Sequence, residues 1–378
     1  MSNKRKIVFL TGTRADFGKI KSLITAVEAH QDFDPYVFVT GMHLMEAYGY
    51  TLIEVERCGF SHVHTFENQT HETTMDLTLC KTIEGFSSYI KAIVPDLIIV
   101  HGDRVEALAG AIVGSLNNVL VAHIEGGELS GTIDELIRHS VSKLSHIHYT
   151  SNDEAKQRLI QMGELPESIF TIGSPDIDIM FSDQLPSLET AKAYYEIDFD
   201  TYALVLYHPV TTEVDQIEQD VKHFVDALTS TETSYIVVYP NNDLGSQMIL
   251  KAYQPLKTNP KFRIFPSLRF EYFLTLLKHA NFIIGNSSAG IREAPYYGIP
   301  SINIGSRQHN RATLPSVINC DAEVDDILGA ISKRSTLDYP KVQHFGIGDS
   351  TKKFMDSINS KSLWALDHQK QFKDIYGK

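Results

Sequence analysis

The chain has 378 residues, of which 43% are hydrophobic and 21% charged, and its formal net charge is −13. This length fits two domains of comparable size better than a single core. The negative charge argues against nucleic acid or an anionic membrane as a partner, because their phosphate groups would be repelled. A small anionic ligand is compatible with it if a few arginines concentrate positive potential locally.

The chain shows no membrane or export segment. No apolar run approaches the roughly 20 residues that cross a bilayer. The apolar run in the N-terminal "MSNKRKIVFLTG" is too short for a secretory signal. Cys58, Cys80 and Cys320 lie far apart without metal-ligand spacing, so we expect reduced core thiols. These features predict a cytoplasmic protein with no membrane partner.

Short apolar runs rich in strand-forming residues recur along the chain, separated by amphipathic segments of helix length. The first series of predicted strands covers residues 6–12, 35–41, 96–103, 119–127, 146–152 and 169–175. The second series covers residues 203–209, 235–243, 262–267, 282–288, 300–306 and 316–320. Because the runs are continuously apolar, they are typical of parallel strands covered by helices on both faces. The predicted class is α/β with parallel sheets, and the pattern occurs twice.

The two series are separated by "SPDIDIMFSDQLPSLET", whose Pro, Ser and Asp residues mark the expected domain boundary. We place the N-terminal domain at residues 1–175 and the C-terminal domain at residues 176–360. The stretch after residue 350 looks helical and contains the sole tryptophan, Trp364. A C-terminal helix at residues 361–378 is expected to pack back on the N-terminal domain.

Polar or glycine-rich clusters follow nearly every predicted strand, among them "TGTRAD", "HGDR", "YHPVTTE" and "GNSSAG". Ligands of open parallel sheets bind at the carboxyl ends of the strands. Two such sheets facing one another would line an interdomain cleft with these clusters. We therefore expect the functional residues at the strand ends.

Strand ends of the first series offer several candidates. In "TGTRAD", free backbone N–H groups and Arg14 could hold a phosphate, and a plain turn with a surface arginine is the alternative. In "HGDRVEA", Asp103 could act as an acid or base and Arg104 as a phosphate clamp. An ion pair that caps a helix would explain the same two residues. His43, in "TGMH", belongs to the same edge.

In the second series, "GNSSAGIREA" combines the hydroxyls of Ser287 and Ser288 with Gly290, where the backbone can approach a ligand closely. The N-terminus of the following helix could bind a diphosphate without a lysine. Glu293, one turn into that helix, is placed to bond the two hydroxyls of a ribose. A serine-capped helix is the structural alternative for either serine alone.

Two further strand ends of the second series carry candidate residues. His208 in "YHPVTTE" directly follows a strand and could contact phosphate or move protons, although a lone histidine is more often structural. Arg307 in "GSRQHNR" follows another strand and could bind an anion.

The stretch "HIEGGELSGTIDELIRH" carries four carboxylates between the end of a strand and a helix. Glu125 ends the strand, and Asp134 and Glu135 begin the helix. Crowded carboxylates raise one another's pKa values, so one can remain protonated as an acid while another serves as a base. A metal site and a solvated acidic loop are the alternatives. Because the second domain supplies serines and arginines for phosphate, we favour acid–base chemistry on a sugar without a metal.

At these residues the chain resembles the UDP-N-acetylglucosamine 2-epimerases, and specifically the hydrolysing branch that opens sialic acid biosynthesis. The match is carried by "TGTRADFGKIK", "HGDR", "HIEGGELSGTIDELIRH", "HPVTTE", "PNND", "GNSSAGIREA" and "GSRQ". The non-hydrolysing branch has Arg-Pro-Glu in place of "RAD" and an Ala-Gly-Leu-Arg-type loop in place of "GGELSG". It also has an His-Arg-Arg-Glu-Asn-type motif in place of "HPVTTE".

The resemblance implies a GT-B-like pair of Rossmann-like domains, whose parallel sheets face an interdomain cleft and close on a UDP-sugar. It implies UDP contacts from Arg14, Ala15, Gly18, Arg104, His208, Asn241, Phe273, Ser287, Ser288, Gly290, Glu293 and Arg307. It implies catalytic roles for Asp103, Glu125, Asp134, Glu135 and His208, and sugar contacts from His43, Asp103 and Glu125. No cofactor or metal is implied, and the expected assembly is a homodimer or homotetramer.

The implied reaction eliminates UDP across C1–C2 to give a glycal, and water then adds with inversion at C2. The products would be N-acetylmannosamine and UDP. A closely related group uses UDP-2,4-diacetamido-2,4,6-trideoxyglucose on the way to legionaminic-type acids, and the motifs leave both sugars open. A GT-B glycosyltransferase and a non-catalytic sensor are alternatives that the carboxylates of the first domain disfavour. A bacterial origin is expected, because the animal enzyme resembles this chain joined to a sugar kinase.

Overall fold

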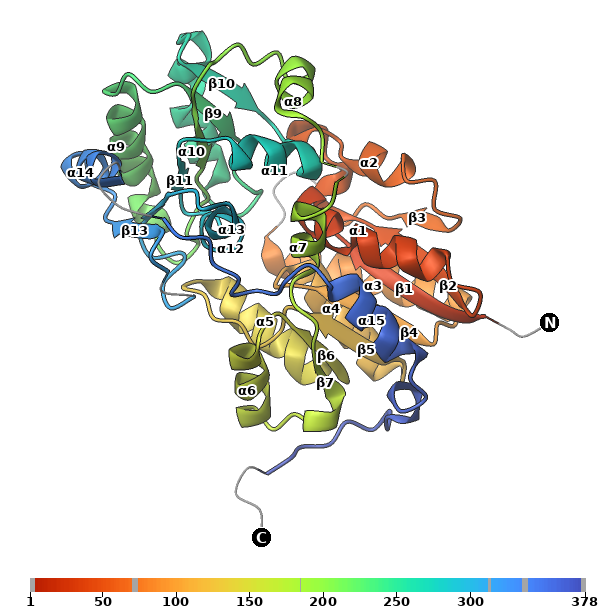
Figure 1. The fold of residues 1–378 in the computed structure, drawn as a ribbon. Helices are drawn as coiled ribbons and strands as arrows, with labels where there is room; N and C mark the ends of the chain where they lie inside the picture. The colour runs from red at the N-terminus through yellow and green to blue at the C-terminus, as the bar shows by residue number, and fades with distance from the viewer. Residues whose placement is uncertain (1–3, 70–73, 184, 312–313, 335–338, 375–378) are drawn as a thin grey trace. The chain divides into compact units, whose positions relative to one another are not determined.

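A computed structural model of the protein describes residues 4–69, 74–183, 185–311, 314–334 and 339–374 (Figure 1). The chain divides into two compact units, each built around one parallel sheet. The first unit comprises Met1–Glu128, Asp134–Ser182 and His344–Lys378, and the second comprises Leu129–Ile133 and Asp183–Gln343. The chain thus returns to the first unit at His344, earlier than the limit expected at residue 360.

The first unit has a seven-stranded sheet in the order β3-β2-β1-β4-β5-β6-β7. Its strands are β1 (Arg5–Thr11), β2 (Phe33–Val39), β3 (Val63–Thr65), β4 (Leu97–His101), β5 (Leu120–Ile124), β6 (Ile147–Thr150) and β7 (Ile169–Thr171). Its helices are α1 (Arg14–Glu28), α2 (Leu52–Glu56), α3 (Met75–Ile93), α4 (Val105–Leu116), α5 (Ile133–Leu144), α6 (Asp153–Gln161), α7 (Pro175–Met180) and α15 (Ser350–Asn359). The strand order reverses between β1 and β4, where ligands bind in such sheets.

Both faces of this sheet are covered by helices, which explains the continuously apolar strands. Ile7 and Phe9 of β1 belong to a core cluster that also contains side chains of α1 and α15. On the other face, α4 packs closely on the sheet, because a Cβ on Gly110 would lie 2.6 Å from Val100 and 3.3 Å from Leu10. Alternate residues of one strand are therefore buried by different helices.

The second unit has a six-stranded parallel sheet in the order β10-β9-β8-β11-β12-β13. Its strands are β8 (Ala203–Leu206), β9 (Tyr235–Val238), β10 (Phe262–Phe265), β11 (Ile283–Gly285), β12 (Ser301–Ile304) and β13 (Val317–Cys320). Its helices are α8 (Leu188–Tyr194), α9 (Ile217–Thr229), α10 (Ser246–Ala252), α11 (Phe270–Lys278), α12 (Ala289–Arg292), α13 (Ala294–Tyr297) and α14 (Val324–Lys333). Here the order reverses between β8 and β11, which carry the "YHP" and "GNSS" ends.

All the strands predicted from the sequence are present, and the two-fold α/β fold is confirmed. The short edge strand β3 was not predicted, because its three residues are all exposed and form no apolar run. The helix expected at residues 361–378 is not formed in its described part, where Leu363–Ala365 make only a 3-10 turn. Helix α15 ends at Asn359, and the Ser360 hydroxyl accepts the Ser362 N–H (3.3 Å), which competes with helix continuation.

The expectation of reduced core thiols holds for part of the cysteine set. All three are free thiols, as predicted. Cys58 and Cys320 are partly buried, whereas Cys80 is exposed on α3 and is therefore not a core residue.

Candidate active site

The loop between β1 and α1 is closed by Asp16. Thr13 accepts the Asp16 backbone N–H at its hydroxyl (3.2 Å), and the Asp16 carboxylate accepts the N–H groups of Gly12 (3.0 Å) and Thr13 (3.1 Å). This capping box occupies backbone donors that the sequence analysis left free for a phosphate. The expectation is wrong for these two N–H groups, and Arg14, which is partly buried, is the remaining cation of the loop.

The other predicted UDP contacts of this unit differ in exposure. Ala15 is exposed, whereas Gly18 is buried within α1. Arg104 Nε lies 3.5 Å from Oε2 of Glu106, a carboxylate that is almost fully buried and was not predicted. Arg104 therefore pairs with a residue of its own strand–helix motif.

Asp103 is held by an arginine from another helix. It forms a salt bridge and hydrogen bond with Arg138 of α5, whose side chain is buried. Arg138 also donates to the Glu128 carbonyl (3.2 Å). About a quarter of the Asp103 side chain remains exposed, at 25%. A long-range pair with Arg138, which the sequence analysis did not predict, thus orients a partly accessible carboxylate.

Glu125 has three polar neighbours and an unusual backbone. Its carboxylate accepts the Ser174 hydroxyl, and its Oε2 lies 3.5 Å from Lys19 Nζ and 3.2 Å from His101 Nε2. The side chain is nearly buried, and the backbone adopts φ 65°, which is uncommon for a residue with a side chain. Such conformations persist where the surroundings over-determine them, and they cluster at functional sites.

Lys19 joins Glu125 to a second carboxylate that sequence analysis missed. Its ammonium lies 3.2 Å from Oδ2 of Asp176, and the Asp176 side chain is fully buried. A lysine on the buried stripe of α1, between Phe17 and Ile20, was the available sequence signal. The buried ammonium lies between the two carboxylates and fixes their positions.

Two buried histidines support these strand ends. His123 has Nε2 2.7 Å from the Gly102 carbonyl and Nδ1 3.0 Å from the Ser142 hydroxyl, and burial lowers its pKa to about 3. His43 has Nε2 3.1 Å from the Thr11 hydroxyl and Nδ1 2.8 Å from that of Thr51, and burial lowers its pKa to about 4. Both rings are neutral donor–acceptors at neutral pH. A sugar could reach His43, a predicted contact, only after a threonine moved away.

Asp134 and Glu135 lie in the first turn of α5 but on different faces. Asp134 precedes Arg138 by four residues and so shares its face of the helix. Glu135 Oε1 lies 3.8 Å from His139 Nε2, one turn further along another face. Of the two, Asp134 is on the side of α5 that holds Asp103.

In the second unit, Asn286 organises the end of β8. Its side chain accepts the His208 N–H at Oδ1 (2.7 Å) and donates from Nδ2 to the His208 carbonyl (2.8 Å). The Asn241 N–H donates to His208 Nδ1 (3.0 Å). A neutral His208 therefore carries its proton on Nε2, which is a hydrogen-bond donor. Asn286, within "GNSS", was missed because only the serines were considered.

The segment after β11 differs from the predicted helix N-terminus. Ser287 and Ser288 precede α12, which has only four residues before Glu293 and a second short helix, α13. The macrodipole of so short a helix is small, so hydroxyl and N–H groups are the available donors. A Cβ on Gly290 would lie 2.3 Å from Ser301 Oγ, so this glycine permits helix–strand packing and not ligand approach. Glu293 is nearly buried.

Arg307 belongs to a loop that the unit holds from several sides. Its Nη1 donates to the Asn286 carbonyl (3.3 Å), which also accepts Gln308 Nε2 (2.9 Å). The Arg307 carbonyl accepts the N–H of Gly131 (3.1 Å), from the glycine-rich part of the carboxylate-bearing stretch. The segment Leu129–Ile133 packs with the second unit, although the sequence analysis placed it in the first domain.

Two predicted nucleotide contacts lie on other strand ends of this sheet. Asn241 follows β9 and donates its side-chain amide to Asp243, while its backbone holds His208. Phe273 lies in α11 and is nearly buried. The second unit thus brings His208, Asn241, Asn286 and Arg307 together through hydrogen bonds around the β8–β11 switch point.

Comparison with known proteins now decides the family. The UDP-N-acetylglucosamine 2-epimerase family profile matches residues 25–359. The chain belongs to the UDP-N-acetylglucosamine 2-epimerase family. The Neisseria meningitidis serogroup B UDP-N-acetylglucosamine 2-epimerase is 48% identical over 98% of this chain and 99% of that protein. The Legionella pneumophila UDP-N,N'-diacetylbacillosamine 2-epimerase (hydrolyzing) is 35% identical over 92% of this chain and 94% of that protein.

A solved structure shows the same fold. The Methanocaldococcus jannaschii UDP-GlcNAc 2-epimerase, in complex with UDP-GlcNAc and UDP, superposes with a TM-score of 0.82 and 22% identity. The match covers 93% of this chain and 99% of that one. The protein is therefore an α/β, GT-B-like enzyme of the 2-epimerase family with two Rossmann-like domains.

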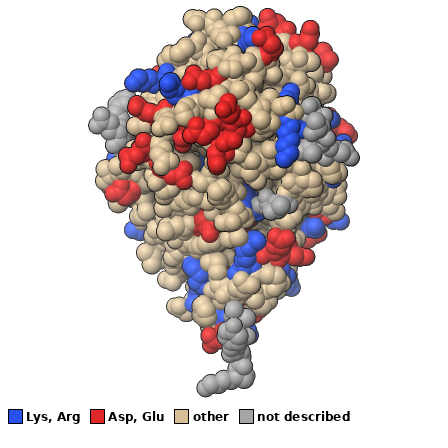
Figure 2. All heavy atoms as spheres, turned by 90° about the vertical axis from the view of Figure 1, so that its left-hand side faces the viewer, with Lys and Arg blue, Asp and Glu red and all other residues tan. Residues whose placement is uncertain are grey.

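The charge of this epimerase-family chain is unevenly spread. Figure 2 shows acidic side chains gathered on the face it views, and the contacting helices α9 and α14 contribute acidic first turns with Glu218, Asp220, Asp325 and Asp326. Burial and the nearby Glu213 raise the pKa of Asp220. Such a surface repels anions, so an anionic ligand of the second unit is favoured away from this face.

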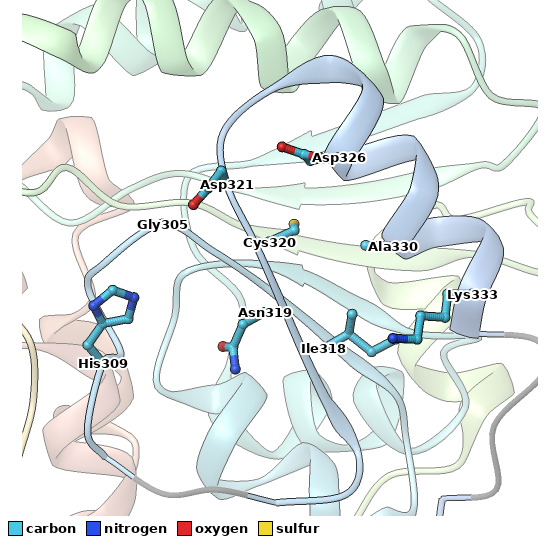
Figure 3. A pocket seen from close by; sticks show the side chains of 9 residues that line it. All are labelled: Gly305, His309, Ile318, Asn319, Cys320, Asp321, Asp326, Ala330 and Lys333. Atoms are coloured by element: carbon cyan, nitrogen blue, oxygen red, sulfur yellow. The ribbon is translucent and has the colours of Figure 1, made fainter.

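Among the described residues, a hollow of about 410 Å³ lies beside β13 and α14 (Figure 3). Its lining includes the carboxylates of Asp321 and Asp326, the ammonium of Lys333, and Gly305 and His309 from the loop that carries Arg307. Burial raises the pKa of Cys320, between them, to about 12. None of these lining residues was predicted as a site residue.

The described residues contain neither a candidate metal cluster nor a candidate membrane-spanning helix. No group of three or more His, Cys, Asp or Glu side chains there is arranged to hold a metal ion. No helix of that part of the chain is long and apolar enough to cross a membrane.

Proposed function

We propose that the protein is a hydrolysing UDP-N-acetylglucosamine 2-epimerase, which converts UDP-N-acetylglucosamine and water to N-acetylmannosamine and UDP. The observation that carries the proposal is Glu125, which follows β5 at φ 65°, accepts the Ser174 hydroxyl and lies 3.5 Å from Lys19 Nζ and 3.2 Å from His101 Nε2. This is a pre-positioned carboxylate in the unit that also holds Asp103 on Arg138. A cytoplasmic location fits a reaction on a nucleotide sugar.

The reaction needs proton transfers in both of its steps. In the first, a base removes the C2 proton, the C1–O bond breaks, a C1=C2 double bond forms and UDP leaves. In the second, water adds its hydroxyl to C1, and C2 receives a proton on the opposite face. We assign the acid and base roles to Glu125, Asp103 and Asp134, which are the positioned carboxylates of the first unit. Glu135 lies on another face of α5, so we assign it a supporting role and not direct proton transfer.

The second unit holds the nucleotide. His208 Nε2–H, the hydroxyls of Ser287 and Ser288, and Arg307 supply donors for the diphosphate. We assign the ribose to Glu293 and further nucleotide contacts of this unit to Asn241 and Phe273; Arg14 is the nucleotide contact that we propose for the first unit. Releasing UDP as the leaving group requires this grip to favour the developing diphosphate charge.

Two observations support the hydrolysing branch. The chain has "GGELSG" where the non-hydrolysing branch has an Ala-Gly-Leu-Arg-type loop. In this loop, Glu128 is buried, and its carboxylate accepts the Ser151 hydroxyl (2.6 Å). In addition, a relative that is 35% identical over most of its length carries the word hydrolyzing in its name.

The same relative favours one second candidate. Its named substrate is UDP-N,N'-diacetylbacillosamine, a UDP-2,4-diacetamido sugar, so the same reaction on that sugar is the alternative. The two substrates differ at C4 and C6 of the sugar, away from the C1–C2 chemistry that the carboxylates carry.

An NMR time course in D₂O, with each UDP-sugar and no acceptor, tests the proposal. We expect free N-acetylmannosamine with deuterium at C2, together with UDP. UDP-N-acetylmannosamine with its UDP attached would establish a non-hydrolysing epimerase instead. Faster turnover of the diacetamido sugar would select the second candidate, and no turnover of either sugar would overturn both.

A further inference from the structure

The C-terminal segment Leu363–Lys373, which we name the strap, is fastened across the first unit at several points. Leu363 lies in the core, and Trp364 stacks on Phe33 with ring centroids 6.1 Å apart. His146 Nε2 lies 3.0 Å from the His368 carbonyl, and the Lys373 N–H donates to the Gly163 carbonyl (2.9 Å). A chain segment fixed in this way can hold a side chain in a defined place.

Lys370 is the side chain that the strap inserts. Its ammonium donates to the carbonyls of Ser142 (3.0 Å) and Ser145 at the end of α5, and lies 2.5 Å from Glu164 Oε2. A cation at these carbonyls compensates the negative end of the helix dipole. The strap thus caps the C-terminus of α5, the helix that carries Asp134 and Arg138 near its start.

A chain of hydrogen bonds leads from this cap to Asp103. The Ser142 carbonyl accepts Lys370, and the Ser142 hydroxyl bonds Nδ1 of the buried His123 (3.0 Å). His123 Nε2 donates to the Gly102 carbonyl (2.7 Å), one residue before Asp103. Helix α5 is therefore tied to the Asp103 loop twice, through His123 and through the Arg138 salt bridge.

We propose that Lys370 is a positioning residue for the acid–base groups, because it fixes α5 and, through Ser142 and His123, the loop of Asp103. The inference rests on the proposed function only for the identity of the reaction. The proposed role of Lys370 involves no contact with substrate, because Lys370 acts through α5. A small displacement of a catalytic group is costly, since a shift of about 1 Å can lower a rate by about 10²-fold.

The test compares Lys370→Met and Lys370→Arg with Lys373→Met, which removes an exposed lysine from the same strap. We expect Lys370→Met to lower kcat at least about tenfold with UDP affinity within about twofold. Lys370→Arg should recover most of the loss, and Lys373→Met should match the wild type. An unchanged kcat in Lys370→Met would overturn the inference, as would an equal loss in Lys373→Met.

A double-mutant cycle and hydrogen exchange provide readouts that a merely structural role would not give. Ser142→Ala combined with Lys370→Met should lose no more activity than the more severe single variant, because both interrupt one chain. Amide exchange in Lys370→Met should quicken in peptides covering residues 100–106 and the end of α5. Exchange that is unchanged there, or faster throughout the unit, would contradict positioning.

The two proposals fail differently. A wild-type protein that turns over neither UDP-sugar contradicts the proposed function, while the exchange pattern still decides the role of Lys370. A wild type that turns over with Lys370→Met equally active contradicts only the positioning role.

Discussion

Glu125 combines a left-handed backbone conformation, which most residues avoid, with polar neighbours that hold its carboxylate in place. A side chain at φ 65° costs free energy that the fold must recover elsewhere, here through Ser174, Lys19 and His101. The same contacts fix the carboxylate where the strand ends. The backbone conformation and contacts of Glu125 therefore identify it as a candidate functional residue more clearly than its sequence motif does.

Replacing Glu125 by Gln should keep the side-chain shape and remove the charge. We expect kcat to fall about 10²-fold or more, with UDP affinity largely kept, because the proposed function assigns acid–base catalysis to Glu125 and nucleotide binding to the second unit. Steady-state kinetics and calorimetric UDP titration measure both. Glu154→Gln, at an exposed glutamate of α6, is the control. Near-normal turnover in Glu125→Gln would remove it from the mechanism.

Lys19 should matter for stability as well as for the site. Lys19→Met leaves Glu125 and the fully buried Asp176 without their cation, so the free energy of unfolding should fall by about 3 kcal/mol or more. Urea unfolding measures the change, with Lys91→Met, at an exposed lysine of α3, as the control. A loss below about 1 kcal/mol would show that the two carboxylates find other compensation.

At the scale of elements, the sequence predicted the strands, because each is marked by a local run of apolar residues. Every predicted strand is present, because a strand buried on both faces is apolar at each position. Strand β3 was missed because it is short and exposed, and the C-terminal helix was extended too far because Ser360 ends α15.

For the candidate site, too, the sequence predicted the residues that a local pattern marks and missed those that tertiary packing brings in. The strand-end rule selected Asp103, Glu125 and His208, since it needs only the end of an apolar run. Their partners escaped notice because they come from distant segments: Arg138 for Asp103, Asp176 beside Lys19, and Asn286 for His208. Pairings over such separations are made by tertiary packing, which no local window contains.

Two glycines in the second unit should respond oppositely to alanine. Gly285 ends β11 at φ 137°, and a Cβ there would lie 2.0 Å from the Leu206 carbonyl oxygen. Gly285→Ala should therefore destabilise by about 2 kcal/mol or more. Gly329 lies inside α14, where a Cβ would meet nothing within 4 Å, so Gly329→Ala should stabilise by about 0.5 to 1 kcal/mol. Thermal unfolding of both variants checks the signs, and equal shifts would refute the packing argument.

At the scale of the whole molecule, the buried histidines predict acid sensitivity. The pKa values of His43 and His123, about 4 and about 3, lie below the value of 6.5 expected in the unfolded chain, because burial disfavours their charged forms. Their contribution to stability is complete above pH 6.5 and is lost as pH falls towards these values. His43 alone should cost about 2 kcal/mol by pH 4.5.

Urea midpoints measured from pH 7.5 to 4.5 test this expectation. The fall should be less steep in His43→Gln, which cannot take up the proton. A urea midpoint of the wild type that stays constant down to pH 4.5 would contradict the prediction, because it would show that protonating these rings does not destabilise the folded protein.

The division of the chain between the two units also orders events during synthesis. The second unit is almost continuous, from Asp183 to Gln343, whereas the first needs His344 onward for α15 and the strap. As the chain leaves the ribosome, the second unit can gather all its strands while the first still lacks the helix that covers α1 and the lysine that caps α5. The half of the protein that is made first is therefore completed last, and a nascent chain stalled before α15 would carry an assembled second unit and an unfinished first unit.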